Sequence, residues 1–152
     1  MAKKRALISV YDKSGLEELA AGLSERDWDI IASGGTSKAI AAAGIPVQSV
    51  EDLTGAEEML DGRVKTLHPI VHAGILARRE SVEHMNELTE SGISTLDLIA
   101  VNLYPFAATV ASDPSRAELI ENIDIGGVAL IRAAAKNHDG VWIIVDPKDC
   151  PK

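Results

Sequence analysis

The sequence predicts an α/β fold with a mainly parallel sheet of about five strands, and three observations lead to this prediction. Short aliphatic runs alternate along the chain with stretches that have the i, i+3, i+4 spacing of helices. The runs are almost continuously apolar, which is typical of strands in a parallel sheet that helices cover on both faces. Aromatic residues make up only 3% of the chain, so the core must be aliphatic.

The predicted elements alternate regularly along the chain. Strands are predicted at residues 5–10, 28–32, 46–50, 96–102 and 141–145. Helices are predicted at residues 14–24, 36–43, 81–90, about 114–122 and 128–136. The first helix carries Glu17 and Glu18 in its first turn, where the helix dipole favours acidic side chains. Residues 51–79 are expected to form a loop followed by an irregular or helical stretch.

Composition limits the kind of protein. The 152 residues are enough for one domain with its own core. A net charge of −8 argues against a nucleic-acid partner, because phosphate backbones require clustered cations. The chain has no apolar run near the ~18 residues of a membrane span and no signal peptide, so we expect a cytoplasmic protein without a membrane partner. A single cysteine, Cys150, excludes an internal disulfide and a cysteine-based metal site.

The end of the sequence suggests a domain boundary. We expect one domain over residues 1–147, and we assign residues 148–152 to the truncated start of a following segment. The ending DPKDCPK is interpreted as a cut and not a finished end, because nothing in it is expected to pack or to cap.

In open parallel sheets, ligands bind outside the carboxyl ends of the strands, so a site is expected in the segments that follow strands. After the second strand, SGGT at residues 33–36 opens a helix, and its glycines, hydroxyls and free helix N–H groups suit a phosphate. The alternative is a glycine turn with Thr36 as N-cap. After the first strand, Lys13 could add a cation beside this phosphate, or it could lie in solvent while Ser14 caps the next helix.

The segment DGRVKTLHP at residues 61–69 clusters cations within an acidic stretch. Arg63 and Lys65 could face an anion, and a solvated charged loop is the alternative. His68 and His72 are four residues apart, but the chain has no HExxH motif and no obvious third ligand. We therefore expect structural histidines and no metal.

Two further segments could surround a flat heterocycle. Asn102 and Tyr104 follow the fourth strand, where a carboxamide and a phenol could contact a base. A buried tyrosine with a satisfied hydroxyl is the alternative. Asp124 precedes a Gly-Gly pair that would let a flat ligand approach, or it caps the next helix. Lys136 ends that helix, where the dipole favours a cation.

In combination these segments resemble one enzyme family, the N-terminal IMP cyclohydrolase domain of bifunctional purine biosynthesis enzymes. The resemblance covers about residues 5–147 and is carried by SVYDKSG, ASGGTSKAI, LTGAEEMLDGRVKTLHPIVHAGILA, VNLYPF and ENIDIGGVALIRAAAKNH. It implies a methylglyoxal-synthase-like three-layer sandwich. It also implies the last step of de novo purine biosynthesis, closure of FAICAR, a formamido-imidazole-carboxamide ribotide, to IMP with loss of water. The formyltransferase half of those enzymes is absent from this sequence, and the full-length enzyme is expected to be a homodimer.

The resemblance assigns roles to individual residues. It implies a catalytic group of Lys65, Tyr104, Asp124 and Lys136. It implies substrate contacts from Tyr11, Asp12, Lys13, Ser33, Gly34, Gly35, Thr36, Arg63, Val64, Thr66, Val101, Asn102, Ile125 and Gly126. Tyr11 departs from the family, in which many members carry serine, and a backbone contact could replace the side-chain one. FAICAR and IMP are the implied ligands, with no cofactor and no metal.

The chemistry that the resemblance implies suits these residue types. The amide nitrogen that attacks the formyl carbon is a poor nucleophile, and a fixed cation would stabilise charge shifted to the carboxamide oxygen. Loss of water from the resulting carbinolamine needs a proton donor. Two other functions stay open, a methylglyoxal synthase-type lyase and a nucleotide-binding regulatory module like that of carbamoyl-phosphate synthetase. The lyase would not need Asn102 and Tyr104, and the regulatory module could dispense with Lys65 and Lys136.

Overall fold

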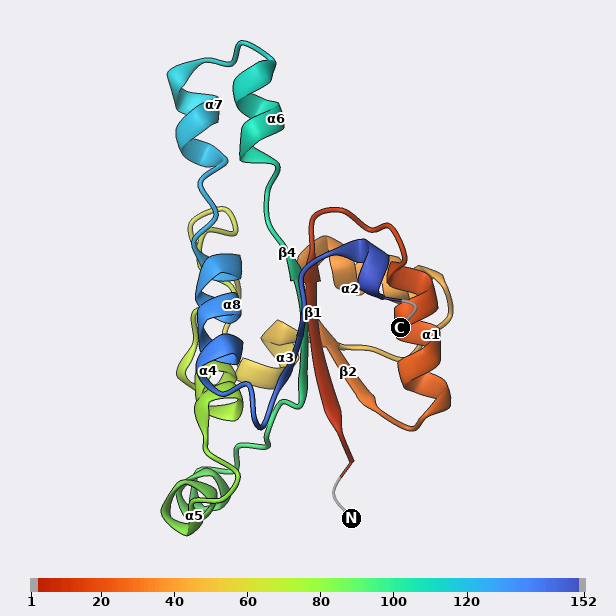
Figure 1. The fold of residues 1–152 in the computed structure, drawn as a ribbon, viewed down its shortest axis with the longest axis vertical. Coiled ribbons are helices and arrows are strands. Elements are labelled where there is room, and N and C mark those ends of the chain that lie inside the picture. Colours follow the sequence, from red (N-terminus) through yellow and green to blue (C-terminus); the bar gives the residue numbers. More distant parts are fainter. Residues whose placement is uncertain (1–2, 151–152) are drawn as a thin grey trace.

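A five-stranded, entirely parallel sheet forms the centre of the computed structural model, which describes residues 3–150 (Figure 1). The strand order is β3-β2-β1-β4-β5. The strands are β1 (Arg5–Val10), β2 (Asp29–Ala32), β3 (Gln48–Ser49), β4 (Leu98–Asn102) and β5 (Trp142–Ile144). The predicted α/β class and the parallel sheet of five strands are confirmed, although β3 is shorter than predicted.

The two faces of the sheet are covered by different helices, as Figure 1 shows. On one side lie α1 (Leu16–Glu25) and α2 (Gly34–Ala42), and on the other lie α3 (Val50–Thr54), α4 (Pro69–Leu76) and α8 (Gly126–Lys136). Alternate β1 residues serve the two cores: Ala6 and Ile8 pack toward α1, and Leu7 packs toward α4 and α8. This alternation produces the three layers.

The remaining helices lie outside these layers. They are α5 (Val82–Glu90), α6 (Phe106–Ala111), α7 (Arg116–Glu121) and the 3₁₀ turn η1 (Pro147–Asp149). The sequence did not predict α3 or α6. In α3, the residue predicted to end a strand instead begins a helix, because the Ser49 hydroxyl accepts the Asp52 N–H as an N-cap. No α6 residue is buried, so α6 lacks the apolar periodicity that reveals a helix.

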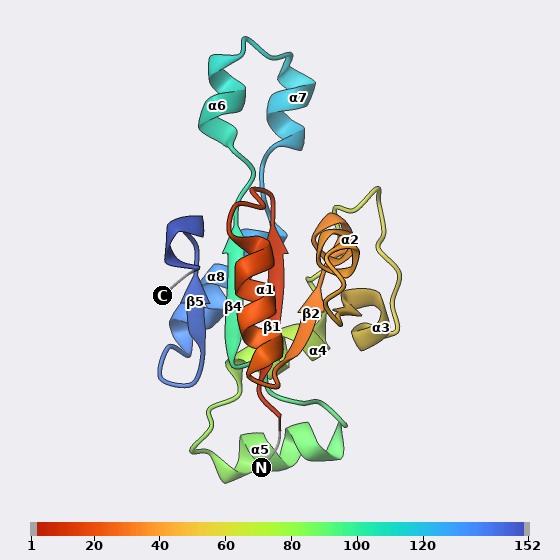
Figure 2. The same cartoon turned by 90° about the vertical axis from the view of Figure 1, so that its right-hand side faces the viewer.

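Helices α6 and α7 form a hairpin that projects beyond the sheet, on the side where β1 and β4 end (Figures 1 and 2). We call residues 106–121 the arm. Ser115 and Glu118 form a reciprocal capping box that starts α7. Neither arm helix contains a buried residue. The arm therefore depends on local hydrogen bonds more than on the core.

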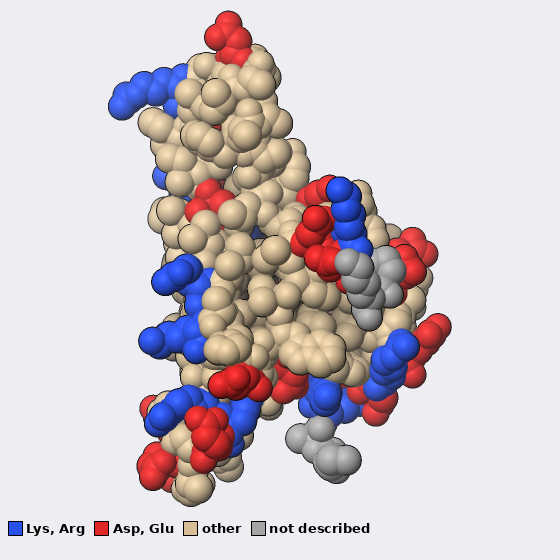
Figure 3. All heavy atoms as spheres, in the orientation of Figure 1, with Lys and Arg blue, Asp and Glu red and all other residues tan. Residues whose placement is uncertain are grey.

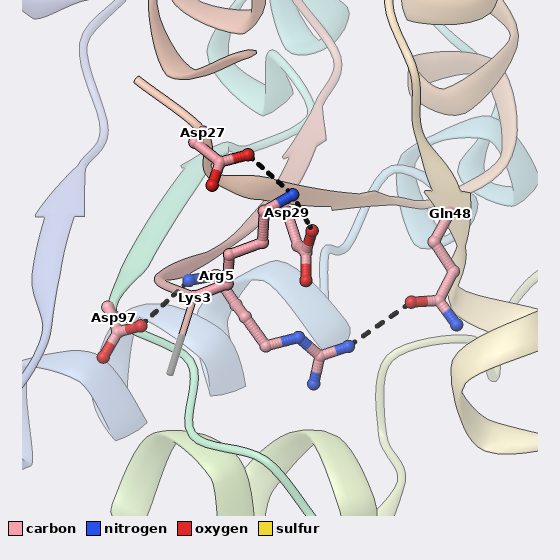
Figure 4. A network of polar contacts seen from close by, with 6 residues as sticks. All are labelled: Lys3, Arg5, Asp27, Asp29, Gln48 and Asp97. Atoms are coloured by element: carbon pink, nitrogen blue, oxygen red, sulfur yellow. Dashed lines mark hydrogen bonds and ion pairs between the residues drawn. The ribbon is translucent and has the colours of Figure 1, made fainter. Parts of the chain in front are cut away.

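Polar side chains join the amino ends of the strands, at the end of the sheet that lies away from the arm (Figure 4). The Asp97 carboxylate accepts the Arg5 backbone N–H at 2.9 Å, and the Arg5 guanidinium donates to Gln48 at 3.3 Å. Lys3 pairs with Asp27 and Asp29. These contacts join the amino ends of four strands, β1, β2, β3 and β4, and leave the carboxyl ends open.

The described part of the chain's end packs against the domain. Asp146 accepts the Lys148 N–H and caps η1, and Cys150 is partly buried against the α1 core. A side chain on Gly15 would lie 3.3 Å from the Cys150 Cβ. The expectation that nothing in the ending packs or caps is therefore wrong for residues 147–150, because apolar surface at the start of α1 is available to cover. Residues 151–152 lie outside the described part, and the boundary at residue 147 stays a prediction. Within residues 3–150, no helix combines the length and apolarity needed to cross a bilayer.

Candidate functional site

A cleft of about 690 Å³ lies where β1, β2 and β4 end. Its volume is that of a small-molecule site, and its position is the one expected for an open parallel sheet. Most of the predicted site residues line it: Tyr11, Lys13, Ser33, Gly35, Thr36, Arg63, Lys65, Thr66, Val101, Asn102, Tyr104, Asp124, Ile125 and Gly126. The structure therefore brings together segments that are more than 100 residues apart in the sequence.

The start of α2 forms one end of the cleft. Ser33, not Thr36, is the N-cap, and its buried hydroxyl is hydrogen-bonded to the Ser9 hydroxyl at 2.8 Å. The Thr36 hydroxyl donates to the Val10 carbonyl and accepts the Val10 N–H, both at 3.1 Å. Thr36 thus ties α2 to β1 while it lines the cleft, and its hydroxyl proton is already donated to the Val10 carbonyl. The first N–H groups of a helix lack intrahelical partners and point at the ligand side.

Two lysines flank this helix start. A Cβ on Gly34 would lie 3.3 Å from the Lys65 Nζ, and a Cβ on Gly35 would lie 3.9 Å from the Lys13 Nζ. The missing side chains leave the room that the ammonium groups occupy. Two cations beside the positive end of a helix dipole make an anion-binding arrangement.

The loop over the cleft is a short hairpin, residues 58–65. Met59 and Val64 exchange backbone hydrogen bonds at 3.0 and 3.2 Å. The turn carries Lys65 into the cleft, whereas Val64 belongs to the backbone bridge and is not part of the lining. An ion pair of 3.3 Å joins the Lys65 Nζ to the Glu58 Oε2.

A second ion pair closes the rim between this hairpin and the arm. The Arg63 Nε donates to the Glu121 Oε1 at 3.3 Å, and the Arg63 Nη2 donates to the Glu121 Oε2. This pairing raises the pKa of Arg63 and lowers the pKa of Glu121. Glu121 was not predicted from the sequence, because no local pattern identifies an acidic residue 58 positions from its partner.

The other end of the cleft is built from segments next to the arm. The Asp124 carboxylate accepts the Gly127 N–H at 2.8 Å and the Tyr104 N–H at 3.3 Å. Asp124 therefore fixes the start of α8, as its capping alternative proposed, while it also lines the cleft. Tyr104 is 42% exposed, which excludes the buried-tyrosine alternative in this chain. Its ring meets the Tyr11 ring edge-on at 5.6 Å.

The Asn102 side chain joins these segments to the β1 loop. Its Oδ1 accepts the Tyr11 and Asp12 N–H groups at 2.7 and 2.9 Å, and its Nδ2 donates to the Asp12 carbonyl at 2.8 Å. Asp12 is not part of the cleft lining. Its carboxylate accepts hydrogen bonds from the Ser14 N–H and the Ser14 hydroxyl. Ser14 is thus bound to Asp12 and does not cap α1, whose N-cap is Gly15. A contact from Asn102 to a heterocycle can use only the remaining N–H of its amide.

His68 and His72 both belong to α4, one at its N-cap and one within the helix. The His68 Nδ1 accepts the Ile70 N–H and caps α4. Burial lowers the pKa of His72, and its buried Nε2 has no hydrogen-bond partner among the described residues. Among residues 3–150 there is no group of three or more potential metal ligands.

Lys136 lies far from this cleft. It ends α8, while Gly126 at the start of the same helix lines the cleft. Ten residues of helix separate them by about 15 Å. Lys136 is exposed, and basic side chains project from the side of the molecule on which α8 lies (Figure 3). The expectation that Lys136 joins the other catalytic residues is therefore not met within one chain.

Comparisons with known proteins agree with this architecture. The family described as "MGS-like domain" matches residues 15–129. Among curated proteins, the chain is similar to the bifunctional purine biosynthesis protein PurH of Deinococcus radiodurans, with 59% identity over 146 residues, 96% of this chain and 28% of that protein. PurH of Caulobacter vibrioides is 54% identical over 149 residues, 98% of this chain and 28% of that protein. The chain thus spans less than a third of the length of these relatives.

A solved structure supports the same comparison. The structure titled "Crystal structure of ForH" matches with a TM-score of 0.86 and 38% identity, over 97% of this chain and 74% of that one. An agreement of this size extends over all three layers of the sandwich.

Proposed function

The chain belongs to the MGS-like domain family, and we propose that within this family it is an IMP cyclohydrolase, which closes the purine ring of FAICAR to give IMP and water. The observation that carries the proposal is the cleft itself, which combines an anion cradle at α2 with Tyr104 and Asp124 in one lining. The 59% identity to a purine biosynthesis protein supports this substrate class.

The 5′-phosphate of the ribotide is assigned to the α2 end. The Ser33 hydroxyl and the Gly34 and Gly35 N–H groups would donate to its oxygens, and the Lys13 ammonium would add a charge-assisted bond. Ser9 supports this by donating to Ser33 when Ser33 turns its own proton to the phosphate. The negative ligand explains why an acidic protein concentrates cations here.

Ring closure is assigned to the centre and the far end. The carboxamide nitrogen attacks the formyl carbon, and charge that shifts to the carboxamide oxygen is stabilised by the Lys65 ammonium. The carbinolamine hydroxyl would then leave as water with a proton from Tyr104, which lines the cleft, and the proton released from the former formamide nitrogen as the C=N bond forms would return to Tyr104. The two N–H bonds to Asp124 hold its carboxylate in the cleft lining, where it would face the imidazole and its amides. Holding both amides in one plane supplies proximity.

Lys136 can act in this chemistry only from a second copy of the chain. Its position at the far end of α8 excludes it from the cleft of its own chain. We propose a cytoplasmic homodimer for the longer enzyme and a weaker dimer for this chain. Mixing Lys65→Ala with Lys136→Ala subunits tests the role of Lys136: recovered activity requires a site shared between copies, and failure to recover assigns Lys136 no role at the cleft.

The decisive experiment mixes the chain with FAICAR and follows IMP absorbance. Formation of IMP that is abolished in Asp124→Asn supports a cyclohydrolase. Binding of IMP without turnover would instead support the regulatory module, and release of methylglyoxal from a triose phosphate would support the lyase. Either of these two results would overturn the proposal.

A further inference from the structure

Glu58 contacts the lysine at the centre of the cleft without lining the cleft itself. Its Oε2 lies 3.3 Å from the Lys65 Nζ. The Lys65 side chain is 29% exposed and that of Glu58 is 45% exposed, so the pair is partly withdrawn from solvent. Neither the sequence motifs nor the proposed mechanism gives Glu58 a role.

The 58–65 hairpin fixes this pair geometrically. Met59 and Val64 face each other in an antiparallel bridge, so the next positions outward, Glu58 and Lys65, are cross-strand neighbours. The turn holds Leu60, Asp61 and Gly62 in left-handed conformations, with φ of 55°, 54° and 86°. Consecutive left-handed residues cost free energy, and they persist only where the surrounding structure requires them. The hairpin therefore has a defined backbone conformation and is not a flexible loop.

Glycines on two sides leave a slot for the Lys65 side chain. A Cβ on Gly62 would lie 2.7 Å from the Lys65 Cε and 3.0 Å from its Nζ. On the other side, a Cβ on Gly34 would lie 3.3 Å from the same Nζ. The Glu58 carboxylate lies at the same slot, because a Cβ on Gly62 would lie 3.6 Å from the Glu58 Oε2, and without this carboxylate the lysine regains rotamer freedom.

We propose that Glu58 is the positioning residue of this site: its carboxylate holds the Lys65 ammonium in the Gly62–Gly34 slot, over the start of α2. The identity of the ligand in this inference rests on the proposed function. Partly exposed ion pairs contribute little to stability. The effect of Glu58 is therefore expected in ligand parameters and not in folding.

A double-mutant cycle tests whether Glu58 acts through Lys65. Ring closure and IMP affinity are measured for Glu58→Gln, Lys65→Ala and the double variant. We expect Glu58→Gln to reduce the same parameter as Lys65→Ala by about 10- to 100-fold, and the double variant to be no worse than Lys65→Ala. Glu58→Asp should recover part of the loss, and Glu57→Gln, the exposed neighbour, should match the parent. Independent losses that multiply in the double variant, or tighter binding by Glu58→Gln, would overturn the inference.

A glycine pair gives a second test with a matched control. Gly62→Ala and Gly55→Ala both place a side chain at a left-handed position, with φ of 86° and 68°, but only at Gly62 does the new Cβ meet Lys65. We expect Gly62→Ala to lose ligand parameters as Glu58→Gln does, and Gly55→Ala to keep them despite lower thermal stability. Equal effects of the two variants on ligand parameters would count against the slot.

Failure of the proposed function would leave this inference testable. If the parent chain forms no IMP and binds none, the pair is tested without a ligand, by comparing the NMR signals of the Lys65 side chain in the parent, Glu58→Gln and Glu57→Gln. A Lys65 side chain that becomes mobile in Glu58→Gln alone would still support Glu58 as the positioning residue, and unchanged signals in both variants would reject it.

Discussion

The two ends of the cleft differ in burial and in the segments that form them. At the α2 end, Ser33 and Thr36 are buried and hydrogen-bonded to β1, the central strand of the sheet. At the other end, Tyr104 and Ile125 are 42% and 59% exposed, and they flank the arm, whose helices bury nothing. One end is part of the core, and the other is a pair of surface segments.

This difference matches what each end must do in the proposed reaction. A phosphate is the same before and after ring closure, so a rigid cradle serves it throughout. The reacting amides change geometry, and segments with few buried contacts can open and close at low free-energy cost. The comparison therefore separates an anchor from a reaction end, with Lys65 of the hairpin between them.

The largest expected effect concerns the cation between the two ends. Replacing Lys65 by Ala should lower kcat on the order of 10²–10³, the scale of one lost oxyanion donor. IMP affinity should change much less, because the phosphate donors at the start of α2 remain. Steady-state kinetics with FAICAR measure both parameters, and Lys38→Ala on the exposed side of α2 is the control. A near-normal kcat with a raised KM would move Lys65 to the anchor.

The second prediction concerns the phosphate group, which the α2 end is proposed to bind. Inosine lacks the phosphate and should bind more than ~3 kcal/mol more weakly than IMP, because several charge-assisted hydrogen bonds are lost. Isothermal calorimetry with the two compounds gives the difference directly. Equal affinities would mean that the α2 end is not a phosphate cradle.

A smaller effect is expected where the arm meets the hairpin. Arg63 lowers the pKa of Glu121, so the pair is fully formed above the ordinary glutamate pKa and is lost as the pH falls through the lowered value. The Arg63 Nε–H resonance, followed by NMR from pH 7 downward, should stay constant past the ordinary glutamate pKa and then shift. In Glu121→Gln it should lack this transition. A transition at the ordinary glutamate pKa would show that the pair is absent in solution.

Removal of metal ions is expected to have no effect. His68 caps α4, burial favours the neutral form of His72, and residues 3–150 contain no group of three or more potential metal ligands, so we expect no bound metal. EDTA should change neither thermal unfolding nor ring closure. Stoichiometric zinc by elemental analysis, lost together with activity, would contradict this prediction.

Local sequence signals predicted most of the anchor. An apolar strand followed by two glycines at the start of a helix is a pattern within a few residues, so SGGT could be placed at a strand end without any tertiary information. The same is partly true of Glu58. The Asp61-Gly62 dipeptide is a hairpin signal that could have paired Glu58 with Lys65 across the turn, although Glu58 was not among the predicted site residues.

The sequence by itself determined the sheet, its parallel order and the segments that surround the cleft, because periodicity and turn residues act locally. Only the tertiary structure decided which polar groups remain available to a ligand. Thr36 and Asn102 are occupied by backbone partners, Arg63 is paired with Glu121 of the arm, and Lys136 lies at the wrong end of its helix. Each of these outcomes depends on the distance between residues far apart in the chain, and a sequence pattern does not encode such distances.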